Sequence, residues 1–405
     1  MKKTDNLITA FIILASLAYF KFFRPIGISE VILKLIYYIF LGIIIISSFK
    51  EFLIKKNIGY SKYISVIIYL IPITFFSAYA FWRQSPILTF VSSFPFFSFF
   101  FFFFFKKHKV SILVIEKIVW IFSIIFAICF MYALLKAPGK VFTGYGLSDE
   151  IDDSRGLFRI RLTIMGAGPI YLAYFMALSK YMASGFKKWI VLALVLFIII
   201  CLQLGRLSIL LTGILGIIYV LKNVSLFKKL LVVGVFLSVT WYSYTQIPFI
   251  VRLVEVSEAQ IERDADDDDI RIKAYDFYMI QMPTNVFTGL FGKGMYTIQR
   301  GNYYGEYINK YGRDKGLIPA DVGYGFIYLL FGVSGLLLFF LILIKVIFQK
   351  IPEEYIYLKY YIYFLMLGNI AGSPLIGTIP TFCMAIYSLY LLSNKRQLAI
   401  SNEKN

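Results

Sequence analysis

The chain has 405 residues, of which 60% are hydrophobic and 19% are aromatic, and its formal net charge at pH 7 is +18. Soluble domains are usually about half apolar, so this composition excludes a soluble protein and predicts a polytopic membrane protein. The positive charge does not predict nucleic-acid binding, because the lysines and arginines are spread over many connections instead of one soluble module.

Apolar runs recur along the whole chain. A hydrocarbon core about 30 Å thick needs roughly 20 apolar residues per helix, and by that measure about twelve membrane-spanning helices are predicted. The fold class that follows is all-α, with residues 1–405 forming a single membrane domain. The predicted helices lie near 6–23, 30–48, 63–82, 86–105, 111–134, 164–184, 188–204, 206–221, 229–247, 319–345, 357–371 and 374–393.

Basic residues gather in every second connection between these segments. The positive-inside rule assigns cation-rich connections to the cytoplasm, so we expect both termini to be cytoplasmic and the alternate connections to be external. Two external connections are too long for simple hairpins: 135–163, and 248–318 between the ninth and tenth helices. The larger loop is rich in tyrosine and phenylalanine, which suit either the membrane interface or stacking against sugar rings.

The candidate catalytic groups are arginines and carboxylates near the external surface. His108 is the only histidine and lies in a predicted cytoplasmic turn, which excludes a Ser/His or Cys/His catalytic pair outside the membrane. Arg206 lies between two apolar runs, either snorkelling at a helix end or presenting a forked cation that fits a phosphate. Arg159 and Arg161, in the first long loop, could add to that positive field.

The acidic stretch "RDADDDDIR" at 263–271 precedes a predicted helix near 270–282. Aspartates there are typical of helix N-terminal caps, although a calcium or magnesium site remains an alternative. The stretch favours a nucleotide-sugar site even less than a metal site, because nucleotide sugars are cytoplasmic and this loop is expected to be external. On such a helix Arg271, Tyr275 and Tyr278 would share one face.

Two further features follow before the chain re-enters the membrane. Gly292-Lys293-Gly294 predicts an ordinary turn. Asp321 then stands at the start of the next helix, beside Tyr324, where it could accept a hydrogen bond from a sugar, act as a general base, or simply cap the helix.

In this order, the pieces resemble the O-antigen polymerase and ligase superfamily of bacterial cell-surface polysaccharide assembly. The resemblance rests on Gly205-Arg206-Leu207-Ser208, the late external loop, the stretch from Arg271 to Gly294, and "DVGYGFIYLLFGVSG" from Asp321 to Gly335. It covers the second half of the chain. The family's ligases carry an essential histidine in that loop, and this chain has none there, which favours a polymerase.

The resemblance implies a fold like that of the GT-C membrane glycosyltransferases in the bacterial inner membrane. It implies transfer of a growing glycan from undecaprenyl pyrophosphate onto a lipid-linked oligosaccharide repeat unit, without a cofactor or metal. Arg206 and Arg271 would bind the leaving pyrophosphate, assisted by Arg159 or Arg161. Asp321 and the tyrosines Tyr275, Tyr278 and Tyr324 would orient the acceptor.

Partners implied by the same resemblance are membrane lipid, a chain-length regulator and a flippase, and no nucleic acid. The sequence leaves open three competing functions. These are a flippase or transporter for the lipid-linked oligosaccharide, an O-antigen ligase, and a scaffolding membrane protein without catalysis. A flippase would be expected to carry charges along several mid-membrane helices, whereas here the charges gather in the external loops and at helix ends.

Overall fold

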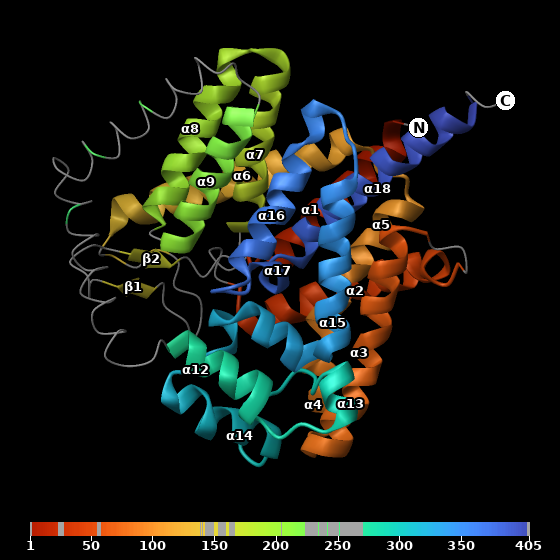
Figure 1. Cartoon of the computed structure of the whole chain (residues 1–405), viewed down its shortest axis with the longest axis vertical. Coiled ribbons are helices and arrows are strands. Elements are labelled where there is room, and N and C mark those ends of the chain that lie inside the picture. The colour runs from red at the N-terminus through yellow and green to blue at the C-terminus, as the bar shows by residue number, and fades with distance from the viewer. Residues whose placement is uncertain are drawn as a thin grey trace.

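The computed structural model describes residues 2–22, 28–54, 58–137, 139, 141, 150–152, 159–161, 167–203, 205–222, 234, 241, 251 and 270–402. Within these residues the protein is all-helical apart from one short antiparallel ribbon, as Figure 1 shows. Helices cover every predicted segment except 229–247, which lies outside the described residues apart from Gly234 and Trp241.

The long helices form a bundle whose members follow the predicted order. They are α1 (Lys2–Tyr19), α2 (Glu30–Phe52), α3 (Tyr60–Trp82), α6 (Ile112–Lys136), α7 (Ala167–Ser184), α8 (Lys187–Leu202), α9 (Arg206–Lys222), α15 (Gly323–Phe348), α16 (Tyr357–Gly368) and α18 (Ile379–Asn402). The shorter elements are α4 (Pro86–Ser93), a 3-10 segment (Phe94–Phe99), α5 (Phe100–Lys107), β1 (Glu150–Asp152), β2 (Arg159–Arg161), α12 (Ile270–Asp276), a π segment (Phe277–Gln281), α13 (Val286–Phe291), α14 (Tyr303–Tyr311) and α17 (Pro374–Gly377).

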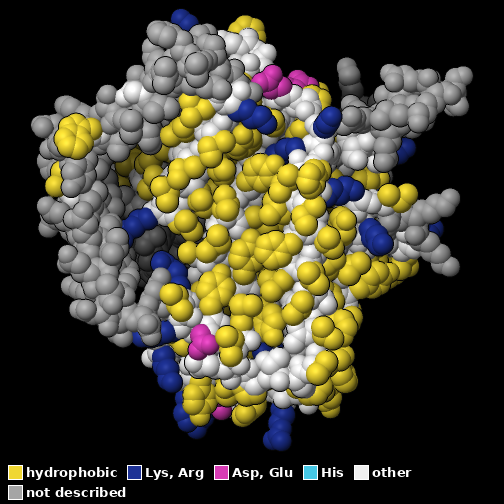
Figure 2. Space-filling view, viewed as in Figure 1, with side chains coloured by type: hydrophobic (Ala, Val, Ile, Leu, Met, Phe, Trp, Pro, Cys, Tyr) yellow, Lys and Arg dark blue, Asp and Glu magenta, His cyan; other side chains and the backbone are white. Residues whose placement is uncertain are grey.

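Five helical stretches of the described chain are long and apolar enough to cross a membrane: 31–52, 60–82, 86–107, 112–136 and 323–348. Hydrophobic side chains cover most of the described surface in the view of Figure 2. Large exposed apolar patches are uncommon on soluble monomers and mark contact with a membrane or a partner. Length, composition and surface therefore agree on a membrane protein.

Serine residues begin three of these helices. Ser29, Ser85 and Ser111 are the N-caps of α2, α4 and α6, and each side chain accepts a hydrogen bond from a backbone N–H in the first turn. Such a bond satisfies one of the amide donors that a helix leaves unpaired at its start. The sequence therefore sets where these helices begin.

The phenylalanine run at 99–105 forms part of the core. All seven rings are at most 4% exposed, and α5 packs against both α2 and α18. A helix that is apolar on every side avoids water by lying either inside a protein core or in lipid, and the burial of these rings shows that this one lies in the core. The low-complexity run thus fills the centre of the bundle.

The predicted continuous helix at 319–345 is instead a helix that begins at Gly323 and breaks at Gly332. Gly332 has φ 62° and ψ −160°, a conformation that glycine adopts without the steric cost borne by other residues. The turn at Gly292-Lys293-Gly294 packs into this break, and the backbone N–H of Lys293 donates to the carbonyl oxygen of Leu329 at 2.7 Å. A Cβ on Gly292 would lie 2.2 Å from the oxygen of Leu330, so only glycine allows the approach.

The segment from Ile270 to Asp321, here named the cap, gathers at one end of the bundle. Figure 1 shows α12, α13 and α14 at the bottom of the molecule, opposite the α7–α8 connection at the top. Buried Gln84, just after α3, ties the cap down: its amide nitrogen donates to Met295 O at 2.8 Å. Its oxygen accepts from Thr297 N and Asn302 Nδ2, both at 2.9 Å.

Candidate functional site

The cap meets the start of α15 and the connection after α16 at a junction built from backbone and phenol groups. The Tyr275 hydroxyl donates to Ile370 O at 2.8 Å, and the Tyr324 backbone N–H donates to Asn369 O at 3.1 Å. The Tyr324 hydroxyl donates to Met366 O at 2.8 Å. Two of the predicted substrate-binding residues, Tyr275 and Tyr324, therefore lie close together, but their hydroxyls already donate hydrogen bonds to backbone carbonyls. We name Arg271, Tyr275, Asp321, Tyr324 and Asn369 the junction site.

Asn369 carries unused hydrogen-bonding capacity in the junction site. Its side chain is fully buried, and neither its amide nitrogen nor its amide oxygen has a partner among the described residues. Gly323 lies against it, since a Cβ there would be 2.5 Å from Asn369 Oδ1 and 2.0 Å from Gly372 O. An unpaired buried amide costs free energy, so such a group in a native site calls for an explanation.

Arg271 and Tyr275 lie on α12, while Tyr278 lies in the π segment that follows. Arg271 is exposed, whereas Tyr278 is fully buried and donates to Leu317 O at 2.7 Å. Burial raises the pKa of the Tyr275 and Tyr278 hydroxyls. The two hydroxyls contact different segments, so Tyr275 and Tyr278 do not present a common binding face with Arg271, and Tyr278 has a structural role inside the cap.

Asp321 is exposed at the point where the cap joins α15. The N-cap of α15 is Val322, without a side-chain capping bond, so Asp321 does not cap this helix. Its backbone N–H donates to Ile318 O at 3.0 Å, which fixes the local turn. The carboxylate is thus presented to solvent beside the junction, where a substrate could reach it.

Arg206 is the first residue of α9 and is half-buried. Helix α9 packs on α16, and Leu211 lies 3.8 Å from the position of a Cβ on Gly368, the last residue of α16. The start of α9 therefore lies at the same end of the bundle as Asn369. The partial burial of Arg206 keeps its permanently charged guanidinium in a setting of low dielectric constant, where attraction to an anion is stronger.

The remaining predicted residues fall at the edge of what the structure describes. Arg159 and Arg161 lie in β2, paired in register with Asp152 and Glu150 of β1. The acidic stretch 263–269 lies outside the described residues, so its capping and ion-binding interpretations stay predictions. Among the described residues, no group of His, Cys, Asp or Glu has the arrangement to hold a metal ion.

Sequence reasoning treated Lys293 as an ordinary turn residue, but the structure buries it. Its side chain is 0% exposed, and Nζ has no hydrogen-bond partner in the part of the chain that the structure describes. The Tyr328 ring lies 5.4 Å away. Burial lowers the pKa of Lys293 to about 8. No local signal could have revealed this, because the turn around Lys293 packs against distant segments: Gly294 lies against Thr74 of α3, and Gly292 lies against Leu330 at the break in α15.

Comparison with known proteins gives no assignment. The sequence matches no model of a protein family, no curated protein and no solved structure.

Proposed function

We propose that the protein is a polysaccharide polymerase of the bacterial plasma membrane. It transfers a growing glycan from undecaprenyl pyrophosphate onto a lipid-linked oligosaccharide repeat unit at the external face. The observation that carries the proposal is the gathering of Arg271, Asp321 and Asn369 at one end of the helices, the end at which α9 begins with Arg206. This end is rich in groups that recognise phosphate and hydroxyl, and it lies beside an apolar surface that fits a polyprenyl chain.

The orientation proposed for this reaction places the cap outside. The cation-rich α7–α8 connection lies at the end opposite the cap in Figure 1, and the positive-inside rule assigns that connection to the cytoplasm. The proposal includes about twelve spans, more than the five long apolar helices and the two shorter ones, Asn6–Tyr19 and Ile379–Asn394, that the described residues contain. The donor and acceptor lipids then reach the cap from the outer leaflet.

The roles of the residues follow from charge. Arg206 and Arg271 bind the diphosphate and stabilise the charge that develops as it leaves, which is the largest electrostatic demand of the transfer. Asp321 accepts the proton or hydrogen bond of the acceptor hydroxyl, and the unpaired Asn369 amide orients a neighbouring sugar or phosphate oxygen. Arg159 and Arg161 extend the positive field. No metal or cofactor takes part in this scheme.

The test supplies purified protein in nanodiscs with a lipid-pyrophosphate-linked repeat unit and follows glycan length by gel electrophoresis. A ladder of longer glycans is expected, and Arg206→Ala and Arg271→Ala should each reduce its rate at least about tenfold, a loss of about 1.4 kcal/mol of transition-state stabilisation. Arg300→Ala, in an exposed turn of the cap, is the matched control.

Several outcomes would contradict the proposal. A ladder that survives both arginine substitutions refutes the site assignment. No ladder, together with movement of the labelled lipid across vesicle membranes, favours the flippase. A ladder abolished by a chelator would show that a metal ion takes part.

A further inference from the structure

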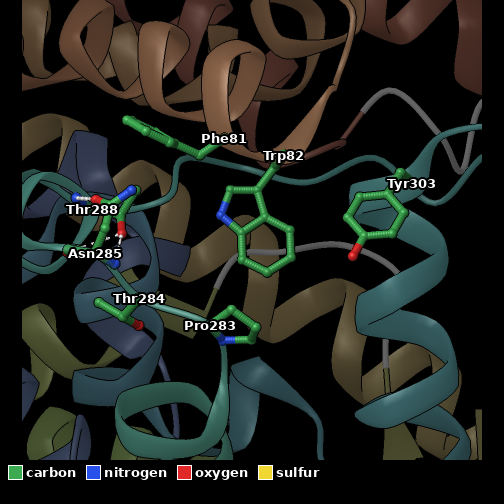
Figure 3. Close-up of a pocket in the computed structure, with 7 residues that line it drawn as sticks. All are labelled: Phe81, Trp82, Pro283, Thr284, Asn285, Thr288 and Tyr303. Carbon is green, nitrogen blue, oxygen red and sulfur yellow. Dashed lines mark hydrogen bonds between the residues drawn. The ribbon is translucent and has the colours of Figure 1, made fainter.

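A pocket opens in the cap, apart from the junction site. It has a volume of about 290 Å³ and lies between the end of α3, the segment 283–288 and the start of α14. Figure 3 shows its lining: Phe81, Trp82, Pro283, Thr284, Asn285, Thr288 and Tyr303. The volume is near the lower end of the roughly 300–1,000 Å³ range of small-molecule sites, which fits a ligand of one or two rings.

The rings of the pocket are held by the cap itself. Trp82 is 4% exposed and stacks on Tyr304 with ring centroids 4.8 Å apart, while Tyr307 meets it edge-on at 5.3 Å. Tyr303 lies nearly parallel to Trp82, with an interplanar angle of 24° at 6.2 Å, and is 52% exposed. A fixed indole beside an accessible phenol forms a preorganised aromatic wall, so little side-chain entropy is lost when a ligand packs against it.

The polar groups of the pocket are neutral, and several have spare bonding capacity. Asn285 and Thr288 cap α13 by mutual bonds, which fixes the carboxamide and leaves its Nδ2 donor without a partner in the described chain. The Trp82 indole N–H and the Tyr303 hydroxyl are two further neutral groups of the lining that can form hydrogen bonds. In Figure 3 the indole nitrogen lies on the side of the ring that faces Asn285 and Thr288. Among the residues that the structure describes, no lysine, arginine, aspartate or glutamate lines the pocket.

We propose that this pocket binds an uncharged sugar ring of a glycan. A pyranose has an apolar face of C–H groups that packs on aromatic rings, and a rim of hydroxyls that pairs with amide, hydroxyl and indole groups. A phosphate or an acidic sugar would meet no cation here, and an acyl chain would leave the Asn285 and Trp82 donors unpaired. The inference rests on the proposed function for the source of the glycan, and makes the pocket a glycan subsite in the cap, separate from the junction site.

The binding test uses Trp82 as its own probe. The chain has four tryptophans, so a full-length variant with Trp120→Phe, Trp189→Phe and Trp241→Phe leaves Trp82 as the only indole. This protein, in nanodiscs, is titrated with a panel of neutral oligosaccharides and with uronic-acid-containing and fatty-acid probes. Saturable change in Trp82 fluorescence with at least one neutral oligosaccharide, and not with the acidic or fatty-acid probes, is expected.

Substitutions on α14 then locate the site. Tyr303→Ala should weaken oligosaccharide binding at least about tenfold, and Tyr303→Phe, which keeps the ring, should weaken it less. Tyr311→Ala, on the same helix but outside the pocket, is the matched control and should bind as the parent does. The inference is overturned if no neutral oligosaccharide binds, if Tyr303→Ala binds as tightly as Tyr311→Ala, or if the acidic or fatty-acid probes bind more tightly.

The polymerase assay separates this inference from the proposed function. Oligosaccharide binding at Trp82 without any glycan ladder would refute the polymerase and leave the subsite standing. A normal ladder with an empty pocket, unchanged by Tyr303→Ala, would refute the subsite and leave the polymerase standing.

Discussion

Replacing Lys293 by methionine should make the protein more stable. The ammonium group is completely buried and has no hydrogen-bond partner in the described part of the chain, and the centre of the Tyr328 ring lies 5.4 Å away. Burial lowers its pKa from 10.5 to about 8. A change of one pKa unit corresponds to about 1.4 kcal/mol, so the charged form costs the folded state about 3 kcal/mol at neutral pH.

The same shift fixes the direction of a pH effect. Between about pH 8 and pH 10.5 the unfolded chain keeps a proton on Lys293 that the folded chain has lost. The free energy of unfolding therefore rises with pH across this window, and the destabilisation is fully present below about pH 8. Methionine has a similar length and no charge, so Lys293→Met should raise stability at pH 7 and remove most of this rise.

Thermal unfolding in detergent at pH 7 and pH 10, compared between parent and variant, measures both effects. Lys310→Met is the control, because Lys310 is an exposed lysine of the same cap. If Lys293→Met lowers the unfolding temperature at pH 7, or keeps the pH dependence of the parent, the ammonium has a stabilising partner and the reasoning is refuted.

Two further substitutions are tested by the same thermal unfolding measurement. Gly292→Ala should destabilise the protein more than Gly301→Ala. Both glycines have positive φ, which costs about 1–2 kcal/mol for alanine, but of the two only Gly292 would also bring a Cβ within 2.2 Å of the Leu330 oxygen. Equal losses of stability would contradict the close approach. Lys180 Nζ lies 2.6 Å from the carboxylate of Glu116, which is 6% exposed. Glu116→Ala leaves this lysine without its carboxylate partner and should lower the free energy of unfolding by about 3 kcal/mol or more. An equal loss in Glu116→Gln would show that the charge of Glu116 is not what stabilises the protein.

The fold was predictable where the signals are local. Apolar length located the helices of the described residues. The N-cap serines Ser29 and Ser111 are also local signals, although the predicted helix bounds did not rest on them. The break in α15 was missed, because the sequence around Gly332 continues apolar on both sides. What opens the helix there is the Gly292-Lys293-Gly294 turn, which comes from another part of the chain and takes over the carbonyl of Leu329. Periodicity cannot register a contact of that kind.

The site was predictable only in part. The sequence predicted Arg271 and Asp321 as site residues from their charge and position, and the structure leaves both exposed at the cap end, while their roles stay predictions. The same reasoning placed Tyr278 in the site, although its hydroxyl closes a buried bond to Leu317. Trp82 went unnoticed because it ends an apolar segment, where an aromatic residue is expected for interfacial reasons alone. Its role depends on tyrosines that only the folded cap brings beside it.

The two sites at the cap end differ in chemistry, and that difference bears on the function. The junction site and α9 offer arginine, carboxylate and amide groups, whereas the pocket beside Trp82 offers rings and neutral donors. A lipid-linked glycan combines a charged diphosphate, an apolar tail and a polyhydroxylated chain, so one such molecule needs both kinds of surface next to a hydrophobic face. A free anion or a lipid alone would need only one of them. The pairing therefore favours a lipid-linked glycan over either simpler ligand as the substrate of this membrane protein.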